Sequence, residues 1–442
     1  MLNRRQMLQG LGAGALLGGL GTRAHAAAAA PEVLVIGAGA AGLVAAKELA
    51  ARGIPAVVLE ARDRIGGRAF TDDSLGVSWD RGCSWLHASN VNPWMDYARQ
   101  AGFEIQPDRA AREIYDGARR MDGAETAGHR AVMERAQREL GRAGARGLDI
   151  PAESALTQET LADPWYPMVM NELTAWEGVE PANFSALDSH RYEEDGEDHV
   201  VPRGLGTLVA HYAKGVEVKL RTPVTRIRWG GRGVAAETAA GLVSARVAVV
   251  ALPSATIAEG SVIFSPHLPA EVLQAHHDLP LGILEKVALR FKRNVFPSEA
   301  TEFLQLKRDD GRGLGYRTRH GGENVCIAFA PGRLARDLEA RGEQAAIAVA
   351  LDELTAMLGG DVRKHFDEGA ATAWASDPYA RGAYSYCVPG RYGARALLTR
   401  PVGGRIVFAG EHTEQAAYGT VHGAYRSGLR AAAEARRLLG RA

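Results

Sequence analysis

A glycine-rich turn near the start of the chain could bind the phosphates of a dinucleotide. Residues 37–42 read GAGAAG, with glycines in the GxGxxG spacing. In that spacing Gly37 allows a tight turn, Gly39 lets the backbone approach a pyrophosphate, and Gly42 lets a helix pack on a sheet. The amide groups and positive dipole end of that helix would face the phosphates. Glu60, further along, could accept hydrogen bonds from a ribose diol.

A second glycine-rich group lies at the other end of the chain. Residues 408–413 read FAGEHT, and residues 419–423 read GTVHG. The run 405–410 is predicted as a buried strand that ends in glycine. We therefore expect the C-terminal part of the chain to fold back and complete the nucleotide site.

The residues after Glu60 distinguish a flavin nucleotide from a nicotinamide one. Residues 60–68 read EARDRIGGR, an ExxxxxGGR pattern. Together with the C-terminal FAGEHT and GTVHGAYRSGL segments, this pattern resembles the flavin-containing amine oxidases, and its detail is closest to the polyamine oxidases. The resemblance runs from about residue 32 to the end of the chain. It implies FAD as the cofactor.

The resemblance also implies a fold of mixed α/β and α+β class. A Rossmann-like FAD-binding domain would be interleaved with a substrate domain of mixed sheet and helices, as in the amine oxidase or glutathione-reductase-2-like fold. We predict that residues 32–90, 201–275 and 372–442 form the FAD-binding domain, and that residues 91–200 and 276–371 form the substrate-binding domain.

Hydrophobic patterns predict the elements that would position these motifs. Residues 33–36 and 56–60 are predicted as buried strands around a helix at 40–52, which makes one βαβ unit. Gly53-Ile54-Pro55 would end that helix. Further helices are predicted at 128–140, 342–358 and 420–439, and residues 216–228 and 242–252 are predicted as strands of a sheet, with others at 284–291 and 324–329.

By resemblance, FAD contacts fall in both halves of the site. Arg68 would reach the pyrophosphate, although a solvated loop cation is the alternative. Glu411 would face the ribityl and phosphate region, the backbone amide of Val421 the pyrimidine end of the flavin, and Val224 the adenine. The expected FAD-binding residues are Gly37, Gly39, Ala41, Gly42, Glu60, Ala61, Arg62, Gly67, Arg68, Gly82, Ser84, Trp85, Leu86, Val224, Trp374, Gly410, Glu411, Thr420 and Val421.

Lys286 stands inside the apolar strand pattern LEKVALRF at residues 284–291. A buried lysine is costly unless it has a partner. By resemblance this lysine would hold a water near flavin N5, a water implicated in reoxidation of the flavin. A strand-edge lysine that faces solvent is the alternative.

Two other side chains are candidates for contact with a substrate amine. Tyr384, within residues 374–386, matches an aromatic wall of the substrate cage, which could orient an amine nitrogen and exclude water. Trp374 would support it, and aromatic core packing is the alternative for both. His87 ends the segment GCSWLH at 82–87, where an imidazole could influence the protonation of an amine or could be purely structural.

The chain departs from the monoamine oxidases at two positions. Their cysteine that links the flavin falls at Ala383 here, and Cys387 does not align with it. The resemblance therefore implies non-covalent FAD. Their second cage tyrosine falls at Thr420, where animal polyamine oxidases and histone lysine demethylases also have threonine. This would open one side of the cage to a longer or bulkier amine.

The N-terminus resembles a twin-arginine export signal, which we expect to occupy residues 1–26. Residues 3–8 read NRRQML, and residues 24–26 read AHA, a small-x-small cleavage pattern. An uncleaved membrane anchor is the alternative, but residues 7–22 would span only about 24 Å as a helix, against about 30 Å for a bilayer core. We therefore expect a periplasmic protein without stable membrane insertion.

Composition and charge are those of an ordinary globular protein. Lysine plus arginine equals aspartate plus glutamate at 52 each, so nothing suggests nucleic acid as a partner. Cys83, Cys326 and Cys387 are far apart and lack metal-ligand spacing, and an odd number does not suggest a disulfide framework. We expect no metal site.

The resemblance implies oxidation of an amine. A hydride would pass from the carbon next to nitrogen to flavin N5, and the imine would hydrolyse to an aldehyde. We expect a polyamine or alkylamine substrate, with O2 or a periplasmic acceptor reoxidising the flavin. The acidic run EEDGED at 193–198 could attract a polycation, although a solvated charge run is the default.

Several other functions stay open at the level of sequence. The same fold could serve an L-amino acid oxidase, a nicotine-type cyclic amine oxidase or a carotenoid desaturase-like enzyme. A non-catalytic FAD-binding partner is a further alternative. An amino acid oxidase would need a cation for the substrate carboxylate, and the GCSWLH segment at 82–87 offers no obvious one.

Overall fold

The computed structural model of the chain describes residues 31–193 and 197–441. Residues Pro31–Ala442 form one compact unit. The predicted export signal at residues 1–26 lies outside the described residues. Within the described ranges, no helix has both the length and the apolar character that a membrane crossing requires.

The predicted nucleotide motifs lie on a five-stranded sheet in which every neighbouring pair is parallel, in the order β10-β2-β1-β14-β21. Its central strands are apolar throughout because other elements cover both faces of the sheet. The strands are β1 (Val33–Ile36), β2 (Ala56–Leu59), β10 (Val218–Lys219), β14 (Val247–Val250) and β21 (Ile406–Phe408).

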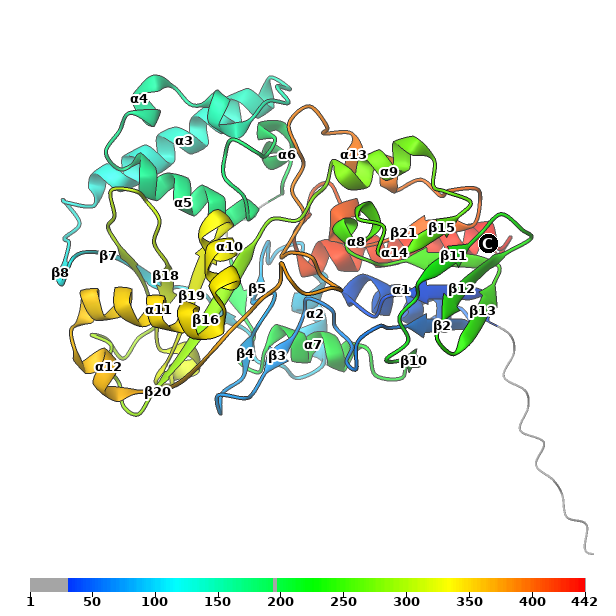
Figure 1. Cartoon of the computed structure of the whole chain (residues 1–442), viewed down its shortest axis with the longest axis horizontal. Coiled ribbons are helices and arrows are strands. Elements are labelled where there is room, and N and C mark those ends of the chain that lie inside the picture. Colours follow the sequence, from blue (N-terminus) through cyan, green and yellow to red (C-terminus); the bar gives the residue numbers. More distant parts are fainter. Residues whose placement is uncertain (1–30, 194–196, 442) are drawn as a thin grey trace, which may run out of the picture. The chain divides into compact units, whose positions relative to one another are not determined.

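Alternate side chains of this sheet enter two different cores. Val33 and Val35 pack with helices α1 (Ala40–Ala51) and α14 (Val421–Leu438) on one face. Leu34 and Ile36 belong to the core on the other face, because successive side chains of a strand point to opposite sides. The first and last helices of the described chain therefore lie side by side over one sheet (Figure 1).

The structure has strands within both predicted ranges, 216–228 and 242–252, but neither range is one continuous strand. Each range is split between the parallel sheet and a four-stranded sheet, ordered β13-β12-β11-β15. Pro223 lies in the break of the first range, where its fixed φ and missing N–H do not suit a central strand. The second sheet contains β11 (Arg226–Arg228), β12 (Val234–Thr238), β13 (Gly241–Ala245) and β15 (Ile263–Ser265).

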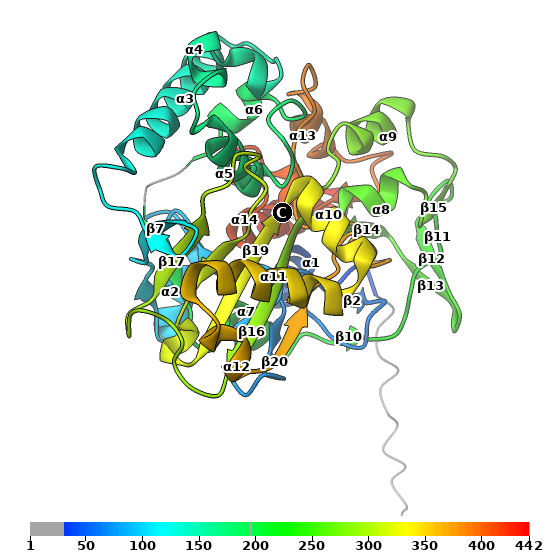
Figure 2. The same ribbon diagram turned by 60° about the vertical axis from the view of Figure 1, so that its left-hand side comes forward.

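A seven-stranded mixed sheet forms the other large layer, in the order β20-β16-β19-β18-β17-β7-β8. Helices α10 (Gly332–Arg341) and α11 (Glu343–Leu358) lie across one of its faces in both views (Figures 1 and 2). Its strands are β7 (Ala111–Asp116), β8 (Arg119–Arg120), β16 (Leu284–Phe291), β17 (Glu302–Leu306), β18 (Gly315–Arg317), β19 (Val325–Pro331) and β20 (Phe366–Ala371).

Shorter elements complete the described chain. Two small sheets join β3 (Thr71–Asp72) with β4 (Trp79–Asp80), and β5 (Trp85–Leu86) with β9 (His199–Val200) and β6 (Gln106–Pro107). The remaining α-helices are α2 (Pro93–Gln100), α3 (Ala127–Ala145), α4 (Gln158–Leu161), α5 (Tyr166–Glu177), α6 (Ala186–His190), α7 (Leu205–Tyr212), α8 (Ser254–Ala258), α9 (Ala270–His277), α12 (Asp361–His365) and α13 (Ala394–Leu398).

The arrangement confirms the predicted fold class, a Rossmann-like parallel sheet combined with a mixed sheet and helices. All strands of the parallel sheet come from the three segments predicted for the FAD-binding domain. All strands of the seven-stranded sheet come from the two segments predicted for the substrate-binding domain. The boundaries of the two domains stay a prediction.

Candidate active site

One large cavity, of about 1110 Å³, collects the predicted site residues. Gly37 and Glu60 line one part, which we call the nucleotide end, and Lys286 and Tyr384 line another, which we call the inner end. Nearly all the residues predicted from sequence line it, namely Gly37, Gly39, Ala41, Glu60, Ala61, Arg62, Gly67, Arg68, Gly82, Ser84, Trp85, His87, Val224, Lys286, Trp374, Tyr384, Gly410, Glu411, Thr420 and Val421.

Two predicted residues do not line the cavity. Gly42 lies behind the turn, where an added Cβ would meet the carbonyl oxygen of Gly37 at 2.0 Å and Val35 at 3.2 Å. That contact agrees with a packing role between helix and sheet. Leu86 is fully buried in the core beside α1, and its neighbours Trp85 and His87 reach the cavity instead.

The glycine turn has room and donors for a pyrophosphate. Gly37 has a φ of +98°, a conformation that favours glycine. A Cβ added at Gly39 would meet nothing within 4 Å, so the backbone there is open to an approaching group. No side chain caps the N-terminus of α1, which leaves its first amide groups for an anion. This part of the cavity therefore fits the diphosphate of FAD.

Glu60 is held at the end of β2 by two backbone amides. One carboxylate oxygen accepts a hydrogen bond from the N–H of Ala38 at 2.7 Å, and the other accepts one from Arg62 at 2.8 Å. The side chain is buried but lines the cavity. A carboxylate fixed in this way can still accept hydrogen bonds on its remaining lone pairs, as a ribose diol requires.

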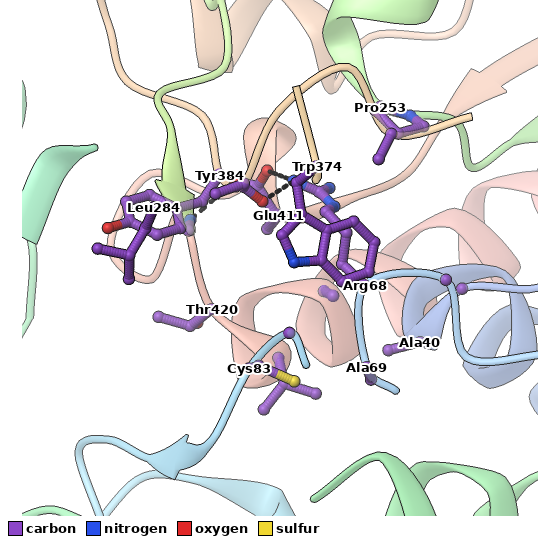
Figure 3. A pocket seen from close by; sticks show the side chains of 18 of the residues that line it. Ala40, Arg68, Ala69, Cys83, Pro253, Leu284, Trp374, Tyr384, Glu411 and Thr420 are labelled. Atoms are coloured by element: carbon purple, nitrogen blue, oxygen red, sulfur yellow. Dashed lines mark hydrogen bonds and ion pairs between the residues drawn. The ribbon is translucent and has the colours of Figure 1, made fainter. Parts of the chain in front are cut away.

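Arg68 and Glu411 join the two halves of the site. Nη1 of Arg68 donates to Glu411 at 2.9 Å and to the carbonyl oxygen of Ala383 at 2.7 Å. Figure 3 shows this pair beside the indole of Trp374. Burial alone would raise the pKa of Glu411, but Arg68 and further donors outweigh it and lower the pKa to about 2. Glu411 is therefore a fixed anion that orients the Arg68 guanidinium.

The C-terminal motif positions the start of α14 against the cavity. The Thr420 hydroxyl accepts a hydrogen bond from the N–H of Gly423 at 2.9 Å and donates to the carbonyl oxygen of Ala417 at 2.7 Å. It thus caps the helix, and Val421 is the first helical residue. Because both hydrogen bonds of the hydroxyl are made to the neighbouring backbone, Thr420 contributes only a small side chain to the inner end.

Lys286 is buried on β16, at an exposure of 3%, and its ammonium group is held by the loop that follows β4. Its Nζ donates to the carbonyl oxygens of Asp80 and Gly82 and to the Ser84 hydroxyl. Burial lowers the pKa of Lys286 to about 8, although Asp80 and Cys83 oppose the shift. The solvent-facing alternative for this lysine is therefore wrong.

The two predicted aromatic residues both reach the cavity. The Tyr384 hydroxyl donates to the carbonyl oxygen of Ala175, and the Trp374 indole N–H donates to the carbonyl oxygen of Arg81 at 3.0 Å. Figure 3 shows Tyr384 next to Leu284. With their polar atoms bonded to the backbone, both rings present apolar surface to the cavity.

His87 is paired with an acid from the predicted acidic run. Its Nδ1 lies 2.7 Å from a carboxylate oxygen of Asp198, and both side chains are about one third exposed. Asp198 also lines the cavity. Residues 194–196 of the run lie outside the described residues, so only the flanks of the run are placed.

Sequence reasoning missed Glu177, a buried acid that lines the cavity. It accepts a hydrogen bond from the Tyr418 hydroxyl at 2.9 Å. Burial raises the pKa of Glu177 to about 7, and Asp188 adds to the shift. It ends α5, directly after the exposed Trp176, so its pattern in the sequence is that of a helix surface. No local signal marked it as buried.

The position of a covalent flavin link and the metal prediction can also be examined. Ala383 lines the cavity, whereas Cys387 is buried in the core on the far face of the parallel sheet. A thiol is therefore missing from the position that would link a flavin. No cluster of three or more potential metal ligands occurs within the part of the chain that the structure describes.

Comparisons with known proteins agree with the geometry. A family model described as flavin containing amine oxidoreductase matches residues 40–436. Polyamine oxidase 2 of Arabidopsis thaliana is 29% identical over 441 residues, covering 92% of this chain and 88% of that protein. Polyamine oxidase 3 of Oryza sativa subsp. japonica is 28% identical over 448 residues, covering 92% and 89%.

A second group of relatives is longer than this chain. Lysine-specific histone demethylase 1 homolog 3 of Oryza sativa subsp. japonica is 30% identical over 439 residues, which cover 91% of this chain and 53% of that protein. The family match covers the end of the glycine turn, the Lys286 strand and the C-terminal motif, and the cavity fits a flavin dinucleotide. The chain therefore belongs to the flavin-containing amine oxidoreductases and is an FAD-dependent amine oxidase with a non-covalently bound cofactor.

Proposed function

We propose that the chain oxidises a polyamine or another long alkylamine at a carbon next to nitrogen. The observation that carries this proposal is the charge of the cavity. Each arginine that lines it, in the described part of the chain, has an acidic partner; the pairs are Arg62–Asp377, Arg68–Glu411, Arg81–Asp72, Arg112–Glu172, Arg317–Asp108 and Arg381–Glu259. Among the described residues, Glu177 and Asp198, like Glu60 at the nucleotide end, line the cavity without an arginine or lysine partner.

This charge distribution favours a cationic substrate over an amino acid. An amino acid oxidase needs a free cation for the substrate carboxylate, whereas these arginines are neutralised by acids. Glu177 and Asp198 can attract an ammonium group instead. The small Thr420 at the inner end leaves room for a long chain, and relatives named polyamine oxidases support the same substrate class.

FAD, when bound, supplies the chemistry by accepting a hydride, which carries two electrons, from the amine carbon. The residues of the chain have other tasks. Tyr384 and Trp374 present apolar walls that orient the substrate and exclude water. Because its pKa is about 7, Glu177 can take a proton from the incoming ammonium group. The substrate must lose this proton because the nitrogen lone pair takes part in the oxidation. O2 or a periplasmic acceptor then takes the electrons.

The test is anaerobic mixing of the purified enzyme with putrescine, spermidine, spermine, a phenylalkylamine, nicotine and L-amino acids. We expect the polyamines to bleach the visible flavin band, and admission of air then shows whether O2 restores it. Glu177→Gln should weaken polyamine binding, whereas Glu180→Gln, outside the cavity, should not. Bleaching by amino acids or nicotine alone would reject the proposal.

We also propose export by the twin-arginine route to the periplasm, based on the NRRQML motif and the AHA site at residues 24–26. Replacement of Arg4 and Arg5 by lysine should retain the uncleaved chain in the cytoplasm. The check is cell fractionation with N-terminal sequencing of the exported protein. Periplasmic enzyme in the lysine variant would contradict this route.

A further inference from the structure

The three hydrogen-bond partners of the Lys286 ammonium group differ in what they can do. The carbonyl oxygens of Asp80 and Gly82 accept its hydrogens at 2.8 and 2.6 Å, and the Ser84 hydroxyl accepts at 2.5 Å. An ammonium group has three hydrogens to donate and no lone pair. The protein therefore uses every donor of charged Lys286.

The neutral form of Lys286 would also be satisfied, but only if one partner reverses its role. A neutral amine has two N–H groups and one lone pair. Carbonyl oxygens can only accept, so those of Asp80 and Gly82 would keep the two N–H groups. The Ser84 hydroxyl can both accept and donate, so it can turn its own hydrogen toward the lone pair. Ser84 is thus the partner that can follow a change of protonation.

Ser84 also connects Lys286 with the cavity. Its side chain is half-buried and lines the inner end, and within the described residues Lys286 is its one hydrogen-bond partner. When Lys286 is charged, the hydroxyl hydrogen of Ser84 is consequently free to point into the cavity. A proton that left Nζ in any other direction would first have to break a bond to a carbonyl oxygen.

The surroundings allow both protonation states near neutral pH. The titratable groups whose charges influence Lys286 either have hydrogen-bond partners of their own or lie on other elements. They are Asp80, Cys83, Glu285, Arg317 and His320.

Three of these groups are visibly committed elsewhere. The Asp80 carboxylate accepts from the first amides of α7 and from Thr71. Glu285 accepts from Thr372 and Trp374. Arg317 is paired with Asp108. None of these side chains is bonded to Nζ, so the proton of Lys286 has Ser84 as its outlet.

We propose that Ser84 is the proton relay between Lys286 and the cavity. In one transfer the Nζ–H bond breaks and a new Oγ–H bond forms, while the original Oγ–H hydrogen passes to the oxygen of a cavity water. Lys286 ends neutral, Ser84 is again a hydroxyl, and the water carries the proton away, so nothing is oxidised or reduced. The inference deepens the proposed amine oxidation, since flavin reoxidation requires proton movement at this end of the cavity.

The test measures proton exchange at Lys286 without any substrate. The holoenzyme is labelled with 15N-lysine, the Lys286 signal is assigned with Lys286→Arg, and the exchange of its Nζ hydrogens with solvent is measured by NMR. Ser84→Ala should slow this exchange about tenfold or more, because a bond to a carbonyl must now open first. Ser84→Thr keeps a hydroxyl and should exchange at the wild-type rate.

Matched controls separate the relay from a structural effect. Ser261→Ala removes another cavity-lining hydroxyl and should leave the exchange unchanged. If Ser84→Ala loses its FAD, Ser84→Cys gives the same reading, since a thiol is a weak donor and acceptor of similar size. Wild-type exchange in the alanine or cysteine variant would overturn the relay. If Ser84→Ala slows the exchange but polyamines do not reduce the wild-type flavin, the relay is supported and the proposed substrate is rejected.

Discussion

Glu177 offers the sharpest electrostatic prediction. Its carboxyl group is buried at the wall of the cavity and accepts a hydrogen bond from Tyr418. Burial, the largest cause, raises its pKa from 4.5 to about 7. Glu177→Gln keeps the size of the side chain and an oxygen for Tyr418 but cannot ionise. The substitution therefore removes the charge and little else.

The magnitude follows from the pKa shift. A tenfold change in an acid constant corresponds to about 1.4 kcal/mol, so the rise of the pKa from 4.5 to about 7 disfavours the charged form in the folded state by about 3.5 kcal/mol. Below pH 4.5 Glu177 is protonated in both the folded and unfolded states, and the cost is absent. It grows as pH rises and is complete above pH 7. We thus expect Glu177→Gln to be more stable than wild type at pH 8 and equally stable near pH 4.5.

The assay is thermal unfolding of the holoenzyme in excess FAD, from pH 4.5 to 8.5. The difference in Tm between Glu177→Gln and wild type should rise to a few degrees across this range, and Glu180→Gln should show no such trend. A pH-independent difference, or a variant less stable than wild type at pH 8, would refute the reasoning. Such a result would mean that ionisation of Glu177 does not destabilise the folded protein.

Four further predictions concern the cofactor, the stability of the fold and the substrate. Gly39→Ala should fold but bind FAD at least tenfold more weakly in a titration, because its methyl group would enter the space expected for the pyrophosphate. Gly42→Ala should instead lower Tm in a melting curve, because its Cβ would meet a carbonyl oxygen at 2.0 Å. Asp377 accepts two hydrogen bonds from Arg62, at 2.6 and 2.8 Å, and Asp377→Ala removes this ion pair. The variant should release FAD severalfold faster on dilution, as measured by flavin fluorescence. An unchanged rate would show that the pair does not help to retain the cofactor. Thr420→Tyr should narrow the inner end and lower kcat/KM for spermine more than for a phenylalkylamine, and an equal loss for both would argue against a cage opened by threonine.

The elements around the glycine turn could be predicted from sequence because their causes are local. The buried strand at 33–36 and the helix that follows have the predicted type and place, within one residue at the helix end. Sterics of a tight turn require glycine at position 37, and its φ of +98° shows why. The C-terminal strand and helix could be predicted for the same reason, since their hydrophobic periodicity and length identify them without knowledge of the elements they pack against.

Tertiary structure decided which residues meet, and therefore which charges are buried. Sequence patterns suggested a costly lysine at 286, but only packing brings its Nζ onto the carbonyl oxygens and hydroxyl of the loop at 80–84, some two hundred positions away. Glu177 and the fully buried Arg395, which is paired with Asp188, carry no local mark of burial. The split of residues 216–228 between two sheets likewise depends on strand partners.

The physical reason for this division is the range of the forces involved. Turn sterics and hydrophobic periodicity act over a few residues, so the sequence alone determined the nucleotide motif and the elements around it, while the fold class and the family followed from the resemblance of its motifs to known oxidases. Desolvation and hydrogen bonding to a buried side chain depend on every segment packed around it. The proton outlet at Ser84, the near-neutral pKa of Glu177 and the pairing of each cavity arginine with an acid were therefore decided by the tertiary structure.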